Sequence, residues 1–312
     1  MKPLLELSVA PHIRDGESVN KIMWSVVIAL LPAFIAALAL FGMQALRLVT
    51  VSVTMCVVTE FVIRRLRRRD TTIMDGSAVI TGMLLAFVVP PTLPTWMIAL
   101  GAMLAIFLVK ELFGGLGANI FNPALAARAI LLAAFPRFMT TWISPFEGVS
   151  TATPLALVKE RIVTELPSYY DLFIGQVGGS LGETSALALI LGGLFLIVRG
   201  IIRWEIPLIN IAAVFCLSVI VGRDPVYEIL AGGVILGAFF MITDMVTTPL
   251  TRKGGIVFAL GCAIITVAIR QWGGYPEGVC YSILIMNAFT PLIDRWCVPR
   301  RLGQQKNSKK KG

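Results

Sequence analysis

The chain has 312 residues, of which 57% are hydrophobic and only 14% charged, and its mean hydropathy is +0.84. Soluble domains average about 45 to 50% apolar and about 25% charged residues, so this composition excludes an ordinary soluble domain. The net charge of +9 comes largely from short basic runs beside apolar segments, such as 64–70 and 309–311. Such runs are typical of cytoplasmic flanks that contact anionic lipid. We therefore expect contacts with membrane lipids and no nucleic-acid binding.

Ten apolar segments have the character of membrane-spanning helices. A bilayer core of about 30 Å requires roughly 20 apolar residues in a helix. The predicted spans are 22–42, 46–63, 77–90, 95–109, 119–135, 184–198, 205–222, 228–244, 255–270 and 278–294. Residues 1–21 lack the long apolar core and small-residue cleavage site of a signal peptide. We expect them to be retained as a cytoplasmic N-terminal segment.

The distribution of Lys and Arg predicts the orientation of these spans. With a cytoplasmic N-terminus, 20 of the 27 basic residues fall on the cytoplasmic side, six fall outside, and Arg128 lies within a span. Basic residues favour the cytoplasmic side of a membrane. The sequence thus predicts an all-α polytopic membrane protein with about ten transmembrane helices, cytoplasmic N- and C-termini, and a basic cytoplasmic tail at 295–312. The loop 136–183 is then extracytoplasmic.

Several predicted spans are short or interrupted. The span 77–90 is followed by "PPTLP", and "GGLGANIFNP" precedes the apolar part of another. Non-helical backbone at membrane depth is tolerated only where protein or a polar cavity covers it, so broken half-helices and an internal site are expected. Because "ELFGG" at 111–115 resembles "RQWGG" at 270–274, residues 22–135 and 184–294 are predicted to form two inverted five-helix repeats.

The thiol and imidazole groups restrict the redox cofactors that the chain can hold. The only histidine, His12, precedes the first span, which excludes paired-histidine haem ligation. Iron–sulfur clusters need closely spaced thiolates, and the cysteines include no CxxC pair. They are Cys56, Cys216, Cys262, Cys280 and Cys297. We expect them to pack as small hydrophobes, so no metal site is predicted and any electrons must be carried by an organic cofactor.

A Ser/Thr-rich stretch, "EGVSTAT" at 147–153, lies in the longest polar interruption of the chain. Taken alone, such a patch is typical of a solvated loop. Two asparagines offer a second candidate site, since Asn119 and Asn122 are three residues apart and their amides can both donate and accept hydrogen bonds. Asn122 could equally cap a helix that begins at Pro123.

Charged residues near or within the spans form a third group. Arg128 lies in an apolar run, where an unpaired charge costs at least ~2.5 kcal/mol, so either a carboxylate or a bound cofactor is expected beside it. Carboxylates at span ends or breaks are Asp75, Glu111, Asp244, Glu277 and Asp294. Interfacial solvation explains most such groups, but intramembrane carboxylates also line cation paths. Asp244 and Asp294 are the candidates for such a path.

Four long segments carry a resemblance to a known family. They are "SVNKIMWSVVIALLPAF", "DGSAVITGMLLAFVVPPTLPTW", "KELFGGLGANIFNPALAARA" and "GGYPEGVCYSILIMNAFTPLIDR". In this order they resemble the D subunits of the Rnf ion-translocating electron-transport complex. That family is related to the B subunit of the sodium-translocating NADH:quinone reductase. The resemblance covers residues 10–295.

The resemblance implies two flavins. The family attaches FMN through its phosphate to the threonine of a DGxSGAT-type motif, which Thr153 matches here, with Ser150 and Ala152 at the preceding motif positions. Glu147 replaces the aspartate and keeps its charge, whereas Thr151 replaces a glycine and adds a competing hydroxyl. The resemblance also implies a non-covalent riboflavin near Asn119 and Asn122.

The implied function is that of a membrane flavoprotein subunit in a redox-driven ion pump. The complex would couple electron transfer between ferredoxin and NAD to Na+ or H+ translocation in a prokaryotic inner membrane, and this subunit would not be catalytic alone. Implied partners are a second covalent-FMN subunit, iron–sulfur subunits and a flavin transferase. A cofactor-free channel or secondary transporter for a small solute is the alternative, and a structural scaffold explains the breaks less well.

Overall fold

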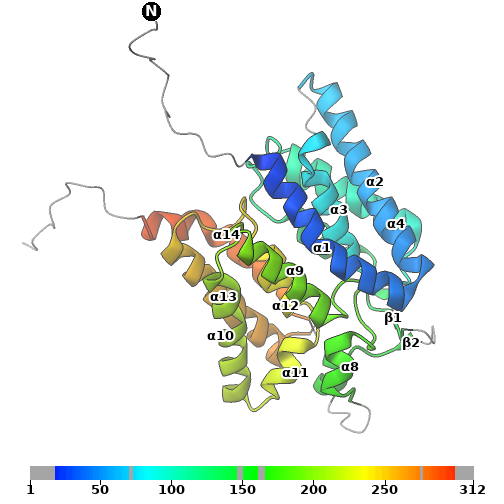
Figure 1. Cartoon of the computed structure of the whole chain (residues 1–312), viewed down its shortest axis with the longest axis vertical. Coiled ribbons are helices and arrows are strands. Elements are labelled where there is room, and N and C mark those ends of the chain that lie inside the picture. The colour runs from blue at the N-terminus through cyan, green and yellow to red at the C-terminus, as the bar shows by residue number, and fades with distance from the viewer. Residues whose placement is uncertain (1–17, 70–72, 146–149, 161–165, 275–276, 299–312) are drawn as a thin grey trace, which may run out of the picture.

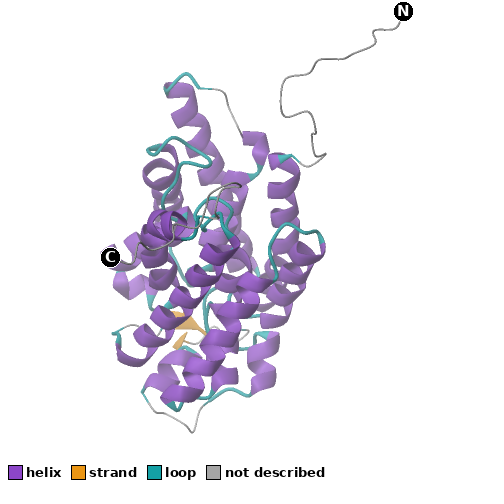
Figure 2. Ribbon diagram, turned by 90° about the vertical axis from the view of Figure 1, so that its left-hand side faces the viewer, coloured by secondary structure: helices purple, strands orange, loops and turns teal. Residues whose placement is uncertain are grey.

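The computed structural model describes residues 18–69, 73–145, 150–160, 166–274 and 277–298, and these form a bundle of helices (Figures 1 and 2). The described strands are a single antiparallel pair, β1 (Trp142–Ile143) and β2 (Ser150–Thr151), in which Trp142 lies opposite Thr151. This pair lies at the end of the bundle away from the start of α1 (Val19–Phe41).

The first half of the chain contains two long helices followed by shorter, interrupted ones. After α1 come α2 (Met43–Leu66), the 3-10 turn η1 (Ile73–Asp75), α3 (Ser77–Phe87), α4 (Thr95–Leu104), the π-helical segment η2 (Ala105–Glu111) and α5 (Pro123–Ala134). The connection to the second half contains α6 (Pro136–Met139), the strand pair, α7 (Pro154–Lys159) and α8 (Tyr169–Ile174).

The second half has a similar succession of long and broken helices. It contains α9 (Ala186–Val198), α10 (Glu205–Val221), α11 (Pro225–Leu230), α12 (Val234–Leu236), the π-helical segment η4 (Gly237–Met241), α13 (Arg252–Trp272) and α14 (Val279–Trp296). A glycine with positive φ precedes a broken helix in each half: Gly76 (φ 81°) before α3 and Gly232 (φ 73°) shortly before α12. Glycine adopts this conformation without the steric cost of a Cβ atom.

The helices agree with the prediction of a mostly helical membrane protein. Each predicted span coincides with helix, although the span 228–244 is divided among α11, α12 and η4 instead of forming one helix. Among the described helices, three are long and apolar enough to cross a membrane by themselves, namely Val19–Phe41, Met43–Leu66 and Arg252–Trp272. The ten crossings and their orientation stay predictions.

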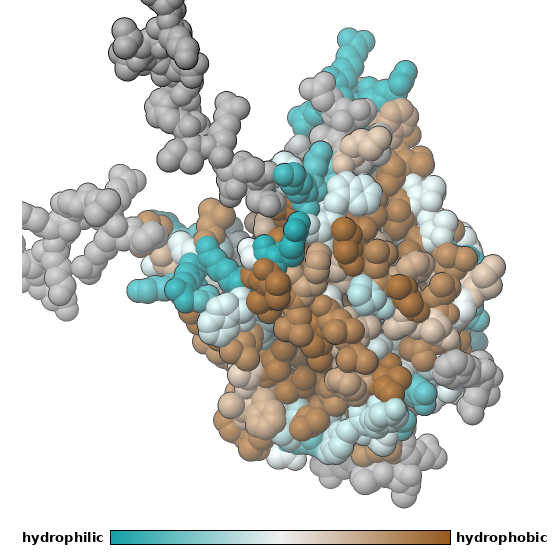
Figure 3. Space-filling view, viewed as in Figure 1, coloured by the Kyte–Doolittle hydropathy of each residue, from teal (hydrophilic) through white to brown (hydrophobic). Residues whose placement is uncertain are grey.

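The outer surface of the bundle is apolar. Large hydrophobic side chains on the long helices point outward, among them Ile35 at 63% exposure and Ile220 at 77%. Figure 3 shows hydrophobic residues across the middle of one face, with hydrophilic residues gathered toward the ends. This distribution is the reverse of a soluble protein and fits contact with lipid.

A loop enters the bundle where α3 ends. The Leu181 and Gly182 amides donate to the carbonyls of Val89 (3.2 Å) and Phe87 (2.9 Å). A Cβ atom at Gly182 would lie 2.2 Å from the Phe87 side chain, so only glycine permits this approach. The loop 175–185 is thereby held against the non-helical backbone that follows α3, which gives that backbone the hydrogen bonds it needs inside an apolar bundle.

Candidate functional site

One cavity among the described residues, which we call the asparagine cavity, has an empty volume of about 800 Å³, which includes the open solvent at its mouth. Its lining comes from α1, α3, the 116–124 segment, the end of α9, and η4 with the residues after it. Its polar side chains include Ser77, Lys110, Asn119, Asn122 and Asp244, and most of the rest are apolar. Small-molecule sites are commonly apolar clefts with a few convergent polar groups.

Asn119 and Asn122 both line the asparagine cavity, although residues 119–122 are not helical as the predicted span 119–135 required, and both side chains are partly engaged. The Asn122 side-chain oxygen accepts from the amides of Ala124 (3.1 Å) and Leu125 (3.3 Å), which makes it the N-cap of α5. The Asn119 amide nitrogen donates to the Phe121 carbonyl (3.1 Å). The capping alternative for Asn122 is therefore observed, and its amide nitrogen is not used by the cap.

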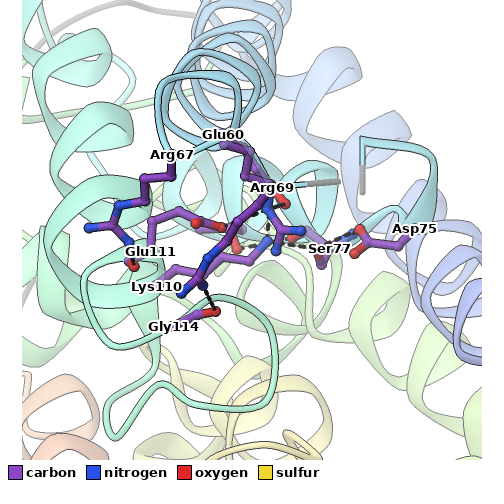
Figure 4. Close-up of polar contacts among 10 residues, drawn as sticks. Glu60, Arg67, Arg69, Asp75, Ser77, Lys110, Glu111 and Gly114 are labelled. Carbon is purple, nitrogen blue, oxygen red and sulfur yellow. Dashed lines mark hydrogen bonds and ion pairs between the residues drawn. The ribbon is translucent and has the colours of Figure 1, made fainter. Parts of the chain in front are cut away.

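A cluster of buried charges borders this cavity, and we call it the α2–η2 cluster (Figure 4). Lys110 Nζ lies 2.8 Å from Glu60 Oε2 and 2.6 Å from Ser77 Oγ. Arg64 Nε lies 2.9 Å from Glu111 Oε1 and 3.4 Å from Glu60 Oε1. Two acids and two bases thus neutralise one another inside the bundle, as buried charges must.

Ser77 extends this cluster to the start of α3. Its hydroxyl accepts from Lys110 and donates to Asp75 Oδ1 (2.6 Å), which also accepts from the Ser77 amide (2.8 Å). Asp75 and Glu111 are both buried, so interfacial solvation does not describe either of them. Sequence reasoning did not single out Glu60 or Lys110. The sequence feature that could have pointed to this cluster is the charged residue Glu60 inside the apolar run that forms α2.

A second cavity, the threonine pocket, has a volume of about 330 Å³. Thr153 lines it and is only 4% exposed, together with Gly178, Ser180, Glu183 and Glu277. Thr153 is the N-cap of α7, and its Oγ1 accepts from the Ala156 amide (3.2 Å). The threonine predicted to carry a flavin therefore faces a small cavity walled partly by glycine.

The other described motif residues, Ser150, Thr151 and Ala152, do not line this pocket. Thr151 is partly buried in β2. Its methyl group packs closely against Gly178, since a Cβ atom added at that glycine would lie only 2.5 Å from it. Ala152 is exposed and Ser150 pairs through its backbone in β2. Glu147 lies outside the described residues. Of the two threonines, Thr153 is the one whose side chain faces the pocket.

Arg128 joins three parts of the chain beside the threonine pocket. Its Nε donates to the Val88 carbonyl after α3 (2.7 Å), and its guanidinium forms an ion pair with Glu277. A carboxylate thus offsets the charge of this arginine, which favours the structural ion-pair alternative over a flavin contact. This pairing links α5 to the segment that precedes α14.

The two candidates for a cation path both contact the segment between η4 and α13, since Asp244 belongs to it and Asp294 contacts it from α14. Asp244 Oδ1 accepts from the Val246 amide (3.2 Å) and its Oδ2 from the Thr247 hydroxyl (3.0 Å). Asp294 accepts from the Leu250 amide (3.0 Å). Both carboxylates hold the backbone of this segment, and Asp244 also lines the asparagine cavity.

A second charge cluster, which we call the α11–α13 cluster, lies in the other half. Glu228 pairs with Arg270 (2.7 Å) and Arg223 (2.8 Å), and Arg270 also donates to the Ala231 carbonyl (3.2 Å). Arg270 occupies the position in "RQWGG" that Glu111 occupies in "ELFGG". The end of α2 and the helix α11 lie at opposite ends of the bundle (Figure 1), as an inverted arrangement of the two halves would require.

Comparison with known proteins assigns the family. The model of the NQR2, RnfD, RnfE family matches residues 6–303. The chain belongs to this family.

Three relatives resemble the chain over almost its whole length. The D subunit of the Na(+)-translocating ferredoxin:NAD(+) oxidoreductase complex of Acetobacterium woodii is 50% identical over 309 residues, covering 98% of this chain and 97% of that protein. The D subunit of the proton-translocating ferredoxin:NAD(+) oxidoreductase complex of Clostridium ljungdahlii is 45% identical over 324 residues, covering 98% of each. The D subunit of the ion-translocating oxidoreductase complex of Stutzerimonas stutzeri is 39% identical, covering 94% of each.

The α2–η2 cluster predicts a double-variant effect on stability. Lys110→Met leaves Glu60 buried with less compensation, which typically costs about 3–5 kcal/mol. Adding Glu60→Gln should restore part of that loss, because neither side chain is then charged. Thermal unfolding of the detergent-extracted complex can be followed with a thiol-reactive dye, since Cys56 and Cys262 are buried free thiols.

Arg252→Met serves as the matched control. Arg252 pairs with Glu205 but is 71% exposed, and exposed pairs contribute only about 0–1 kcal/mol. Equal losses of stability for Lys110→Met and Arg252→Met would contradict the assignment of a buried charge network.

Proposed function

We propose that the chain is the flavin-carrying membrane subunit of a redox-driven ion pump, which passes electrons through FMN bound to Thr153 and riboflavin in the asparagine cavity. Its relatives are named as D subunits of complexes that couple ferredoxin:NAD(+) oxidoreduction to translocation of Na+ or protons. The observation that carries the proposal is the position of Thr153, which faces a pocket instead of open solvent.

The residues around Thr153 fit a phosphate-linked flavin. The ester would form at the Thr153 hydroxyl, whose side chain lines the pocket. FMN would supply one- and two-electron redox chemistry. The enclosed space of the pocket is only about 20 Å³, far below the size of a flavin, so the flavin ring would extend beyond the pocket and could meet a partner subunit.

The asparagine cavity supports the second flavin. Its mostly apolar walls suit the face of a fused-ring ligand. The Asn119 and Asn122 amides could bind the polar pyrimidine edge of an isoalloxazine, with Lys110 and Ser77 nearby. The Asn122 amide nitrogen is the group left over by the helix cap.

The proposed topology has ten spans, both termini in the cytoplasm and the loop 136–183 outside the inner membrane. The asparagine cavity includes residues at the starts of α1 and α3, whereas the threonine pocket lies near β2 and α7 at the other end of the bundle. Basic residues follow α2 on the side of the asparagine cavity. The two flavins would then lie toward opposite membrane faces.

Coupling to ion movement follows from the charge of a reduced flavin. A flavin that gains negative charge in low dielectric is stabilised by a nearby cation, because the Coulomb energy is weakly screened there. Asp244, which lines the asparagine cavity, and Asp294 are the candidates for the path of that cation. The relatives named for Na+ and for protons are 50% and 45% identical, so overall similarity does not choose the ion.

The remaining functions belong to proposed partners. These are a second covalent-FMN subunit, iron–sulfur subunits that exchange electrons with the flavins, a flavin transferase that makes the ester, and the surrounding lipid. A cofactor-free channel or transporter is the competing function, which the broken helices and internal cavity would also suit. Bound flavin distinguishes the two.

Covalent attachment of FMN at Thr153 predicts that this one side chain is required for attachment. After co-expression with a flavin transferase, the denatured wild-type chain should fluoresce in a gel under ultraviolet light, and Thr153→Ala should lose the band because it lacks the ester oxygen. Thr151→Ala should keep it, since that side chain does not line the pocket. A band that survives Thr153→Ala and disappears with Thr151→Ala would move the attachment site. No band in the wild type, beside a fluorescent control, would favour the channel.

Filling the asparagine cavity should displace the non-covalent flavin. Val26 lines the cavity from α1, whereas Ile28 on the same helix is 51% exposed on the outer surface. Val26→Trp should therefore lower the flavin released on denaturing the purified complex, while Ile28→Trp should release as much as wild type. Chromatography of the released flavin gives the measurement. Full release from Val26→Trp would place the riboflavin elsewhere.

A further inference from the structure

Lys110 is a buried cation at the wall of the asparagine cavity. Its side chain is only 2% exposed, and it is the one base among the described residues that line this cavity. The other charged lining residue, Asp244, directs both carboxylate oxygens to its own segment, where they accept from the Val246 amide and the Thr247 hydroxyl. A ligand in the cavity therefore meets a positive charge at Lys110.

One N–H donor of the Lys110 ammonium has no protein partner within the part of the chain that the structure describes. A lysine ammonium carries three N–H donors. Two of them are used, because Nζ donates to Glu60 Oε2 (2.8 Å) and to Ser77 Oγ (2.6 Å) (Figure 4). Leaving a buried donor on a charged group unpaired is costly. The third N–H therefore indicates a hydrogen-bond acceptor that a ligand brings into the cavity.

The partners of Lys110 hold its charge at the cavity wall. Glu60 is fully buried on α2 and is not among the residues that line the cavity, whereas Ser77 lines it. The Ser77 hydroxyl donates to Asp75 Oδ1 (2.6 Å), so its oxygen can accept from the ammonium. Lys110 also lies on the π-helical η2, and π-helical turns are frequent at functional sites. The cation, and not the carboxylate that pairs with it, borders the cavity.

The cavity also contains groups that would orient a ring beside Lys110. The Asn122 amide nitrogen is a donor that the helix cap does not use. The Asn119 amide nitrogen donates to the Phe121 carbonyl, and its amide oxygen accepts no hydrogen bond from the described residues. The pyrimidine edge of an isoalloxazine places an N–H donor between carbonyl acceptors, so it matches one acceptor flanked by donors.

We propose that Lys110 raises the reduction potential of the flavin in the asparagine cavity by donating its third N–H to the pyrimidine edge of the ring. The proposal rests on the proposed function for the identity of the ligand. Protein groups tune a flavin through charge near its ring nitrogens. Lys110 keeps all three protons when an iron–sulfur partner adds one electron to the ring, so its ammonium offsets the added negative charge. The mostly apolar walls screen this attraction weakly.

Redox titration of the bound flavin tests this role. In the full-length Thr153→Ala chain, purified with riboflavin, the non-covalent flavin is followed by absorbance without interference from covalent FMN. Glu60→Gln combined with Lys110→Met removes the ammonium together with its counter-ion. At the potential where the parent chain is half reduced, the ratio of oxidised to reduced flavin in this double variant should be about tenfold higher.

Two controls separate this role from a structural one. Glu60→Gln alone keeps the ammonium and should not raise the oxidised share. Glu205→Gln combined with Arg252→Met removes an ion pair whose arginine is 71% exposed, and it should titrate as the parent chain does. If the first double variant does not assemble, Glu60→Gln with Lys110→Gln takes its place, because two amides can pair without charge. An unchanged ratio after removal of the ammonium, or the same rise in either control, would overturn the proposal.

The same preparations show whether the riboflavin assignment itself holds. Flavin released on denaturation reports whether the chain binds it, and Val26→Trp reports whether it lies in the asparagine cavity. Absence of flavin, or flavin that survives Val26→Trp, would refute the assignment and this proposal with it. Flavin that Val26→Trp displaces, but that titrates identically with and without the Lys110 ammonium, would refute the role of Lys110 alone.

Discussion

Pairing of buried charges is the constraint on which the rest of this structure depends. An unpaired charge inside a membrane bundle costs several kcal/mol, yet Glu60, Lys110, Glu228 and Arg270 are all buried. Each is tolerated because an oppositely charged side chain from another helix contacts it. These pairs fix the interrupted segments of the chain, since Lys110 lies on the π-helical η2 and Glu228 on α11 beside the break before α12. Each half thus contains one buried charge cluster that holds an interrupted segment in place.

The two charge clusters lie beside different cavities. The α2–η2 cluster borders the asparagine cavity through Lys110 and Ser77, and the α11–α13 cluster lies near the threonine pocket, whose wall includes Ala231 and Gly232. Arg128 lies between them and joins the end of α3 to Glu277. Under the proposed function, the bundle would hold its two flavins toward opposite ends. Ion coupling would then act through Asp244 and Asp294, the carboxylates proposed for the cation path.

Much of this arrangement follows from local sequence. Apolar runs predicted the positions of the helices, "PPTLP" and "GGLGANIFNP" predicted the breaks, and Asn122 before Pro123 predicted a helix cap that is observed. The division of 228–244 was missed because the apolar run is continuous across α11, α12 and η4, and only the positive φ of Gly232 reveals the break. The partners of Arg128 and Lys110 could not be read from sequence, because Glu277 and Glu60 are distant along the chain and only the folded bundle brings them near.

The most direct test determines on which side of the membrane each end of the bundle lies. In a cysteine-free background, Arg68→Cys at the end of α2 and Ala152→Cys beside Thr153 both place a thiol at an exposed position. A membrane-impermeant maleimide applied to sealed vesicles should label position 152 only from the extracytoplasmic side and position 68 only from the cytoplasmic side, because the two positions lie at opposite ends of the bundle. Labelling of both from the same side would contradict the account.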